Sequence, residues 1–274
     1  MSFRNELHLQ TNREETTTMF RFAKWLPCTA AFAATVLFGT ARSARADIEL
    51  TLTEVNTSYS YNSGDVTGDS VGFMGGSVGD FSIFMAGGSS NGFGTTADAL
   101  VQEGAMFIKN TSSTAETLQI IVSADGFTSP IVPPLTLYDV VNGTTADSSV
   151  NAPNVSVSDG TAQGYANTSN VLGDISGPGV IDGSALSFQA SGPSTNFSAG
   201  SNGPLSGSVE VDAVTAPYSL TFVETFTLSA GGSLTMTDGN LQMLTPEPAS
   251  LMAALTAVPF LGLGAWRRRR KRAS

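Results

Sequence analysis

The central part of the chain, residues 47–245, lacks the side chains on which much catalysis and metal binding depend. The only cysteine (Cys28) and the only histidine (His8) precede it, and the two tryptophans (Trp25 and Trp266) lie on either side of it. This stretch therefore has no disulfide, no thiol or imidazole metal ligand and no histidine general base. Enzymes and metal sites that need those groups are excluded.

Positive charge is almost absent from the same stretch. Lys109 is its only basic residue, against nineteen aspartates and glutamates, so its net charge is −18. A nucleic-acid surface needs basic patches, so nucleic acid is excluded as a partner. Such an acidic surface repels anionic polymers at low salt and favours solubility. Binding to an uncharged glycan is compatible with it.

The N-terminal residues have the pattern of a secretory signal peptide. Arg21 and Lys24 form a basic region, residues 25–38 an apolar one, and Ala44 and Ala46 provide the small-x-small site that signal peptidase cleaves. The apolar run is shorter than the ~20 residues of a membrane span. We expect residues 1–46 to be the signal peptide. Residues 1–18 fit no such pattern, which indicates translation from Met19.

The C-terminal residues have the pattern of a membrane helix. From Ala249 to Trp266 there are 18 residues without a charge, about 27 Å of helix against a hydrocarbon core of ~30 Å. Trp266 suits the membrane interface, and a stop-transfer cluster follows it: Arg267, Arg268, Arg269 and Arg270. Because such clusters stay in the cytoplasm, residues 47–245 are expected on the other side of the inner membrane.

The order of these C-terminal features resembles a known sorting signal. Pro246, Glu247 and Pro248 precede the apolar segment and its arginine cluster, and residues 246–274 thereby resemble the PEP-CTERM signal of exported bacterial proteins. The same tail is also called the C-terminal domain of ice-binding proteins. The resemblance implies cleavage near the Pro-Glu-Pro motif by an exosortase, then release or attachment at the cell surface, in bacteria that make exopolysaccharide. A plain, uncleaved membrane anchor is the alternative.

Residues 47–245 read as short strands separated by turns. Ile48, Leu50 and Leu52 alternate with polar residues, and similar alternation recurs along the chain. We therefore predict one all-β domain, an antiparallel β-sandwich with a jelly-roll-like arrangement. The pattern also predicts a short helix over residues 96–104, a tight turn at Asp238-Gly239 and mainly loops, or poorly patterned strands, over residues 142–206.

Carboxylates are the only plentiful reactive groups. Glu210 and Asp212 lie two residues apart in an expected strand, the kind of pair that a glycosidase uses, but also what a solvated strand shows. Clustered oxygens are the ligands that Ca²⁺ prefers, and the candidates in glycine- and serine-rich loops are Asp65, Asp69 and Asp80. The alternative, that these aspartates are solubilising turn residues, stays open, and no cofactor is expected.

Two further residue sets bear on binding. Threonines at i, i+2 spacing (Thr51, Thr53, Thr225 and Thr227) form either the ordinary polar face of a strand or an array that orders water or ice. Aromatic residues in loop-like sequence stack on sugars or pack internally: Tyr59, Tyr61, Tyr165 and Phe197. We predict a non-enzymatic structural or adhesive surface or matrix protein. The alternative is a carbohydrate- or ice-binding module, with or without dependence on calcium.

Overall fold

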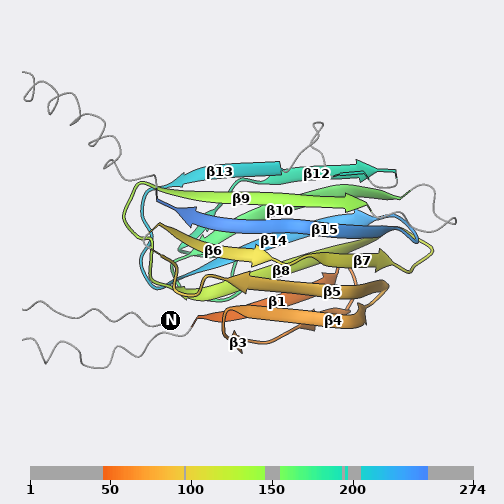
Figure 1. Ribbon diagram of the computed structural model, residues 1–274, viewed down its shortest axis with the longest axis horizontal. Coiled ribbons are helices and arrows are strands. Elements are labelled where there is room, and N and C mark those ends of the chain that lie inside the picture. The colour runs from red at the N-terminus through yellow and green to blue at the C-terminus, as the bar shows by residue number, and fades with distance from the viewer. Residues whose placement is uncertain (1–45, 96, 146–154, 193–194, 197–204, 246–274) are drawn as a thin grey trace, which may run out of the picture. The chain divides into compact units, whose positions relative to one another are not determined.

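The computed structural model describes residues 46–95, 97–145, 155–192, 195–196 and 205–245, and these form two antiparallel sheets packed face to face (Figure 1). The first, sheet A, has the order β11-β10-β14-β8-β1-β2, with β12 paired to β10 and β3 to β1. Its strands are β1 (Asp47–Glu54), β2 (Ser60–Asn62), β3 (Val66–Thr67), β8 (Glu116–Phe127), β10 (Ser156–Asn167), β11 (Val180–Asp182), β12 (Leu186–Ser191) and β14 (Tyr218–Leu228).

The second, sheet B, has the order β13-β9-β15-β6-β5-β4, with β7 paired to both β15 and β5. Its strands are β4 (Ser70–Val78), β5 (Phe81–Ser90), β6 (Asp98–Glu103), β7 (Met106–Asn110), β9 (Leu135–Thr145), β13 (Leu205–Val211) and β15 (Ser233–Leu244). The described part of the chain contains no α-helix. The prediction of an all-β antiparallel sandwich is confirmed.

One hydrophobic core lies between the two sheets. Strand β1 shows how it forms, because Ile48, Leu50 and Leu52 are fully buried while the residues between them stay half-exposed. In sheet A, β14 contributes the largest side chains, Phe222, Phe226 and Tyr218 among them. A chain of this length can bury such a core without disulfides.

Two local predictions are wrong. Residues 98–103 form β6 rather than a helix, because Ala99, Val101 and Glu103 point inward at strand period while Leu100 and Gln102 point outward. Asp238 and Gly239 do not form a turn, because β15 runs through them to Leu244 with only a shift of register after Met236. A bulge accommodates one extra residue without ending a strand.

Residues 142–206, expected to be mainly loops or poorly patterned strands, contribute an interior strand of sheet A, in agreement with the second alternative. Strand β10 pairs with β14 on one side and with β11 and β12 on the other. Its glycines allow close packing rather than turning the chain: a Cβ at Gly164 would meet Leu241 of the opposite sheet at 2.1 Å. The low hydrophobicity of β10 therefore reflects the close approach of the two sheets.

Both ends of the described domain lie at the same end of the sandwich. Strand β1 starts there, beside the last residues of β8, and β15 finishes there (Figure 1). Thr245 N donates a hydrogen bond to Ala97 O at 2.9 Å, just before β6. The segments expected to be the signal peptide (1–46) and the sorting signal (246–274) lie outside the described residues, apart from Ala46. Within the described residues, no helix is long and apolar enough to cross a bilayer.

Candidate functional site

The structure brings the sequence-predicted threonines together on one surface. Thr51 and Thr53 on β1 and Thr225 and Thr227 on β14 all point outward from sheet A, on either side of β8. We call this outward surface the threonine face; it consists of Thr51, Thr53, Thr117, Gln119, Ile121, Thr161, Gln163, Val223, Thr225 and Thr227. None of these side chains is charged, but Glu49, the next outward residue of β1, adjoins them and accepts a hydrogen bond from Thr51 Oγ1 at 3.1 Å.

The antiparallel register sets the threonine face out in straight rows. One row crosses four strands, from Thr53 through Gln119 and Thr225 to Thr161. Neighbouring side chains in a row are about 4.8 Å apart, and rows repeat about every 6.7 Å along a strand. Thr117 Oγ1 and Thr227 Oγ1 lie 2.8 Å apart, and Gln119 Nε2 donates to Thr225 Oγ1 at 3.4 Å. The hydroxyls are thus held in regular rows.

A loop closes one end of the threonine face. Ser219 Oγ donates to Val171 O at 2.9 Å, and Ser123 Oγ accepts from Gly173 N at the same distance. As a result Ser123 and Thr221, which continue the same outward pattern, are buried. The open part of the face therefore lies toward the other end of the strands.

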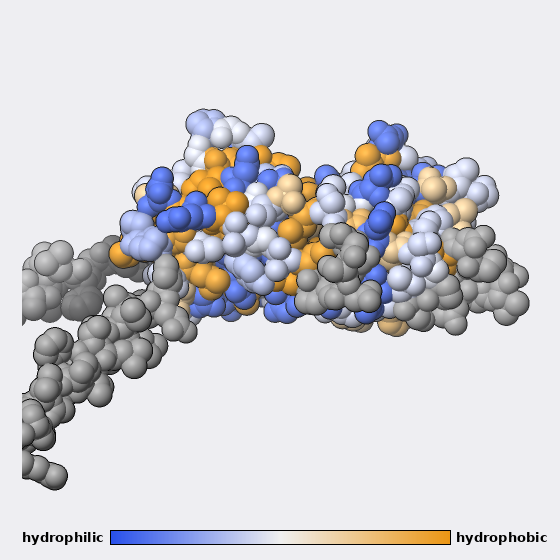
Figure 2. Space-filling model, turned by 90° about the horizontal axis from the view of Figure 1, so that it is seen from above, coloured by the Kyte–Doolittle hydropathy of each residue, from blue (hydrophilic) through white to orange (hydrophobic). Residues whose placement is uncertain are grey.

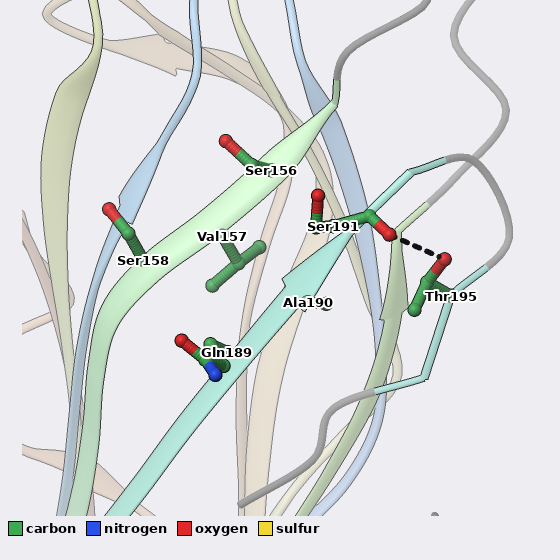
Figure 3. Close-up of a pocket in the computed structure, with 7 residues that line it drawn as sticks. All are labelled: Ser156, Val157, Ser158, Gln189, Ala190, Ser191 and Thr195. Atoms are coloured by element: carbon green, nitrogen blue, oxygen red, sulfur yellow. Dashed lines mark hydrogen bonds between the residues drawn. The ribbon is translucent and has the colours of Figure 1, made fainter. Parts of the chain in front are cut away.

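A hollow of about 430 Å³ adjoins the open part, between β10 and β12 (Figure 3). Its polar lining comes from Ser156, Ser158, Gln189, Ser191 and Thr195, and its apolar lining from Val157 and Ala190. Among the described residues no charged side chain lines it, although Ser158 Oγ donates a hydrogen bond to the neighbouring Asp159 Oδ2 at 3.3 Å. Ser158 is directly opposite Thr227 in the sheet, so the hollow continues the threonine face. Figure 2, seen from the side of β12 and β13, shows a surface on which hydrophilic, near-neutral and hydrophobic residues are interspersed.

A bulge in β10 shapes this hollow. The register of β10 shifts between Val157 and Gly160 against β12 and between Ser158 and Thr161 against β14. Asp159, inside the shift, has a φ of 52°, a conformation that aspartate tolerates better than most residues. Such a bulge bends a strand and redirects its side chains, and here it lies between Ser158, which faces Thr227, and Thr161, which faces Thr225.

The aromatic candidates for sugar stacking lie in different parts of the structure. Tyr165 projects from β10 on the outward side of sheet A, and its hydroxyl donates to Gln163 Oε1 at 3.0 Å. Tyr61 packs edge-on against Phe73, with ring centroids 4.6 Å apart, so it belongs to the core. Tyr59 is exposed in the turn before β2, and Phe197 lies outside the described residues. Only Tyr165 borders the threonine face.

The calcium candidates are not brought to one place. Asp69 and Asp80 sit at opposite ends of β4, roughly 30 Å apart at the rise of a strand. Asp65 lies near the Asp69 end, before β3, and is exposed. In the part of the chain that the structure describes, no three acidic side chains are close enough to share a metal ion.

The expected glycosidase pair does not share a strand. Glu210 is on β13 and exposed, but β13 ends at Val211, so Asp212 belongs to the following loop. The sorting residues Pro246, Glu247, Pro248, Ala249, Trp266 and Arg267–Arg270, and the cleavage-site residue Ala44, lie outside the described residues. Ala46 is buried, and its carbonyl accepts from Gly68 N at 3.2 Å.

The sequence analysis missed a pair of carboxyls inside the core. Glu103 on β6 and Glu224 on β14 point inward from opposite sheets, and both are almost fully buried. A Cβ added at Gly239 would lie 2.5 Å from Glu103 Oε2 and 3.0 Å from Glu224 Oε1, so both carboxyls approach one point on β15. Within the described residues, none of their four carboxyl oxygens has a hydrogen-bond partner. In the sequence, Glu224 interrupts the alternating apolar residues of 218–228. The helix expected over residues 96–104 gave no indication that Glu103 would point into a core between two sheets.

Burial changes the ionisation of this pair. Desolvation, the largest effect, raises the pKa of Glu103 to about 8, partly offset by the adjacent Glu224 side chain. The pKa of Glu224 is raised well above its usual value by desolvation and then by the neighbouring Glu103. A third internal carboxyl, Asp139 on β9, has its pKa raised to about 6 by burial. These groups are closed off from solvent, so a substrate does not reach them.

Comparison with known proteins gives no family. No family model matches the chain, and no curated protein is significantly similar to it. Among solved structures, one match is the carbohydrate-binding module TmCBM27, described as recognising mannan; it is 12% identical, with a TM-score of 0.24 over 65% of this chain and all of that one. A likeness of this size does not transfer a function, so the proposal below rests on the residues of this chain.

Proposed function

We propose that this chain is an exported, non-enzymatic adhesive protein whose β-sandwich binds uncharged polysaccharide on the threonine face and in the adjoining hollow. The observation that carries the proposal is the hollow itself. Among the described residues it is lined by hydroxyls, an amide and two apolar side chains and by no charged group, in a domain with nineteen carboxylates, most of them outside the core.

The chemistry of the lining suits sugar hydroxyls. Serine and threonine hydroxyls donate and accept, and the Gln189 amide does both through separate atoms. A polymer with regularly spaced hydroxyls matches rows of hydroxyls that repeat along and across strands. Tyr165 at the border offers a ring face for stacking. An anionic polysaccharide would be repelled by the acidic surroundings.

Removing two of the hydrogen-bonding groups in the hollow should weaken binding. The double substitution Ser158→Ala/Gln189→Ala is expected to reduce affinity by roughly 5- to 100-fold, because each net hydrogen bond contributes about 0.5–1.5 kcal/mol. Both side chains are exposed, so the fold should not change. Affinity electrophoresis through gels containing glucans, mannans or xylans measures the effect.

The matched control is Gln102→Ala, because Gln102 is also an exposed glutamine but projects from sheet B. Its affinity should equal that of the unaltered protein. Retention of the double variant equal to that of the control would contradict the proposed site. If no uncharged polysaccharide retards the protein but the protein shapes growing ice crystals, the array binds ice instead.

The export and localisation of the protein are the second part of the proposal. Signal peptidase would remove residues 1–46, and the segment after Pro248 would hold the precursor in the inner membrane until an exosortase cuts near the Pro-Glu-Pro motif. The acidic domain would then be released or attached at the surface, beside exopolysaccharide. What supports this is the ordered combination of residues at both ends of the chain.

Substituting the central residue of the motif separates sorting from plain anchoring. In cells that contain an exosortase, Glu247→Ala is expected to leave the C-terminal segment attached, which raises the mature mass by that of the uncleaved tail. Intact-mass measurement of the membrane and extracellular fractions reports both cleavage points. Unchanged processing of the variant would favour a plain anchor.

A further inference from the structure

We infer that the end of the sandwich from which Thr245 leaves rests on the lipid bilayer while the precursor is anchored, with the apolar loop residues Phe93, Ile131, Val132 and Val171 in contact with the headgroup region. This inference rests on the proposed membrane anchor and goes beyond the proposed binding of polysaccharide, which uses a different surface.

Exposed apolar side chains gather at this end. Of the nine large hydrophobic residues that are exposed within the described ranges, four lie in three loops here: Phe93, Ile131, Val132 and Val171. Val132 is the most exposed of them, at 69%. Exposed apolar residues scattered singly need no explanation, but several gathered on one surface mark a contact with a partner or a membrane.

Hydrogen bonds hold the three loops together. Thr128 N donates to Phe93 O at 3.0 Å, which joins the loop after β8 to the loop after β5. Gly126 N donates to Asn170 Oδ1 at 2.8 Å, which joins the end of β8 to the loop after β10. Tyr218 Oη also donates to Ser129 O at 3.1 Å. These hydrogen bonds therefore fix the positions of the loops that bear the apolar residues.

The chain itself brings this end close to a membrane. Thr245 leaves the sandwich beside these loops, tied to Ala97, and the uncharged run begins at Ala249. Four residue steps span at most about 14 Å when fully extended. The polar layer on each side of a bilayer is about 5–8 Å thick. A domain held by so short a connection cannot move far from the lipid.

Charge at this end selects the kind of lipid. Asp47, Asp65, Asp98 and Asp125 lie on the strands and turns beside the loops, and the one lysine of the described domain, Lys109, is on β7 away from them. The carboxylates favour contact with zwitterionic headgroups and oppose deep insertion or an anionic surface at low salt. The contact is therefore shallow and apolar.

A fluorescent probe at Val132 tests the inference. The full chain carrying Cys28→Ser and Val132→Cys, labelled with an environment-sensitive fluorophore, is reconstituted into phosphatidylcholine vesicles through its C-terminal segment. Emission should rise roughly twofold on entry into the interface and be quenched by lipids that carry a quencher. Added phosphatidylglycerol should reduce the rise at low salt.

The matched control is Phe84→Cys, labelled in the same way. Phe84 is 70% exposed, close to Val132, but it lies six residues before the end of β5, about 20 Å along the strand. Its emission should not change. Equal behaviour of the two probes in chains that float with the vesicles overturns the inference and leaves the anchor intact. A chain that does not float overturns both, whereas the polysaccharide assay is unaffected by either result.

Discussion

Replacing Glu103 and Glu224 together by glutamine is expected to raise the unfolding temperature at pH 8 by about 10 °C and to remove most of its dependence on pH. In the unfolded chain both carboxyls lose their protons near pH 4.5. In the folded protein the pKa of Glu103 is about 8 and that of Glu224 is raised well above its ordinary value. The buried pair therefore keeps protons that the unfolded chain releases.

The sign of the effect follows from this difference. Below about pH 4.5 both states are protonated, and the pair costs no ionisation energy. As pH rises from there toward 8, the unfolded state is favoured increasingly, so the free energy of unfolding falls by several kcal/mol. Asp139 and Asp125, whose pKa values are also raised by burial, add to the same slope, as does repulsion from Asp238 near the pair.

Thermal unfolding followed by circular dichroism between pH 5 and pH 9 measures the slope. The control is Glu210→Gln, because Glu210 is an exposed glutamate on β13 and its replacement should leave the slope unchanged. At pH 5 the double variant should be no more stable than the unaltered protein, since two neutral amides then replace two neutral acids. An unfolding temperature that stays constant or rises from pH 5 to pH 8 in the unaltered protein would show that the pair is not desolvated.

Phe226→Ala is expected to lower the free energy of unfolding by about 3–5 kcal/mol, because it removes a buried ring and leaves a cavity that the two sheets only partly close. Phe226 is completely buried in the middle of sheet A, opposite Leu118 in the register. For a domain of this size the loss corresponds to a fall of roughly 10 °C in the unfolding temperature. Urea titration at pH 6 measures it.

The same chemical change on the surface is the control. Phe84→Ala removes an identical side chain from β5, where it is 70% exposed, and should alter stability by no more than about 0.5 kcal/mol. Equal effects at the two positions would mean that the inward and outward faces of the strands are exchanged. The slope of the urea transition should stay the same in both variants, because the surface exposed on unfolding barely changes.

The period-two alternation of apolar and polar residues was enough to predict most strands of the fold. Ile48, Leu50 and Leu52 alternate with polar residues, and alternation of this kind requires one buried and one exposed face. Residues 98–103 were misread because a six-residue apolar pattern fits a helix and a strand almost equally well. Only pairing with β15 and β5 makes that segment β6. Strand β10 was missed because Gly160 and Gly164 look like turn residues until the facing Phe188 and Leu241 are known.

By itself, the sequence determined the all-β class of residues 47–245, their lack of thiol and imidazole groups and their single basic residue, Lys109, because composition and periodicity are properties of the chain alone. It also supplied the threonines of the candidate site, one strand at a time. Only the tertiary structure decided that Thr53, Gln119, Thr225 and Thr161 form one row, that Ser158 and Gln189 share a hollow, and that Glu103 meets Glu224 inside the core. The physical reason is that strand register and sheet packing join residues from 31 to 121 positions apart in these contacts, and no local pattern encodes which strands become neighbours.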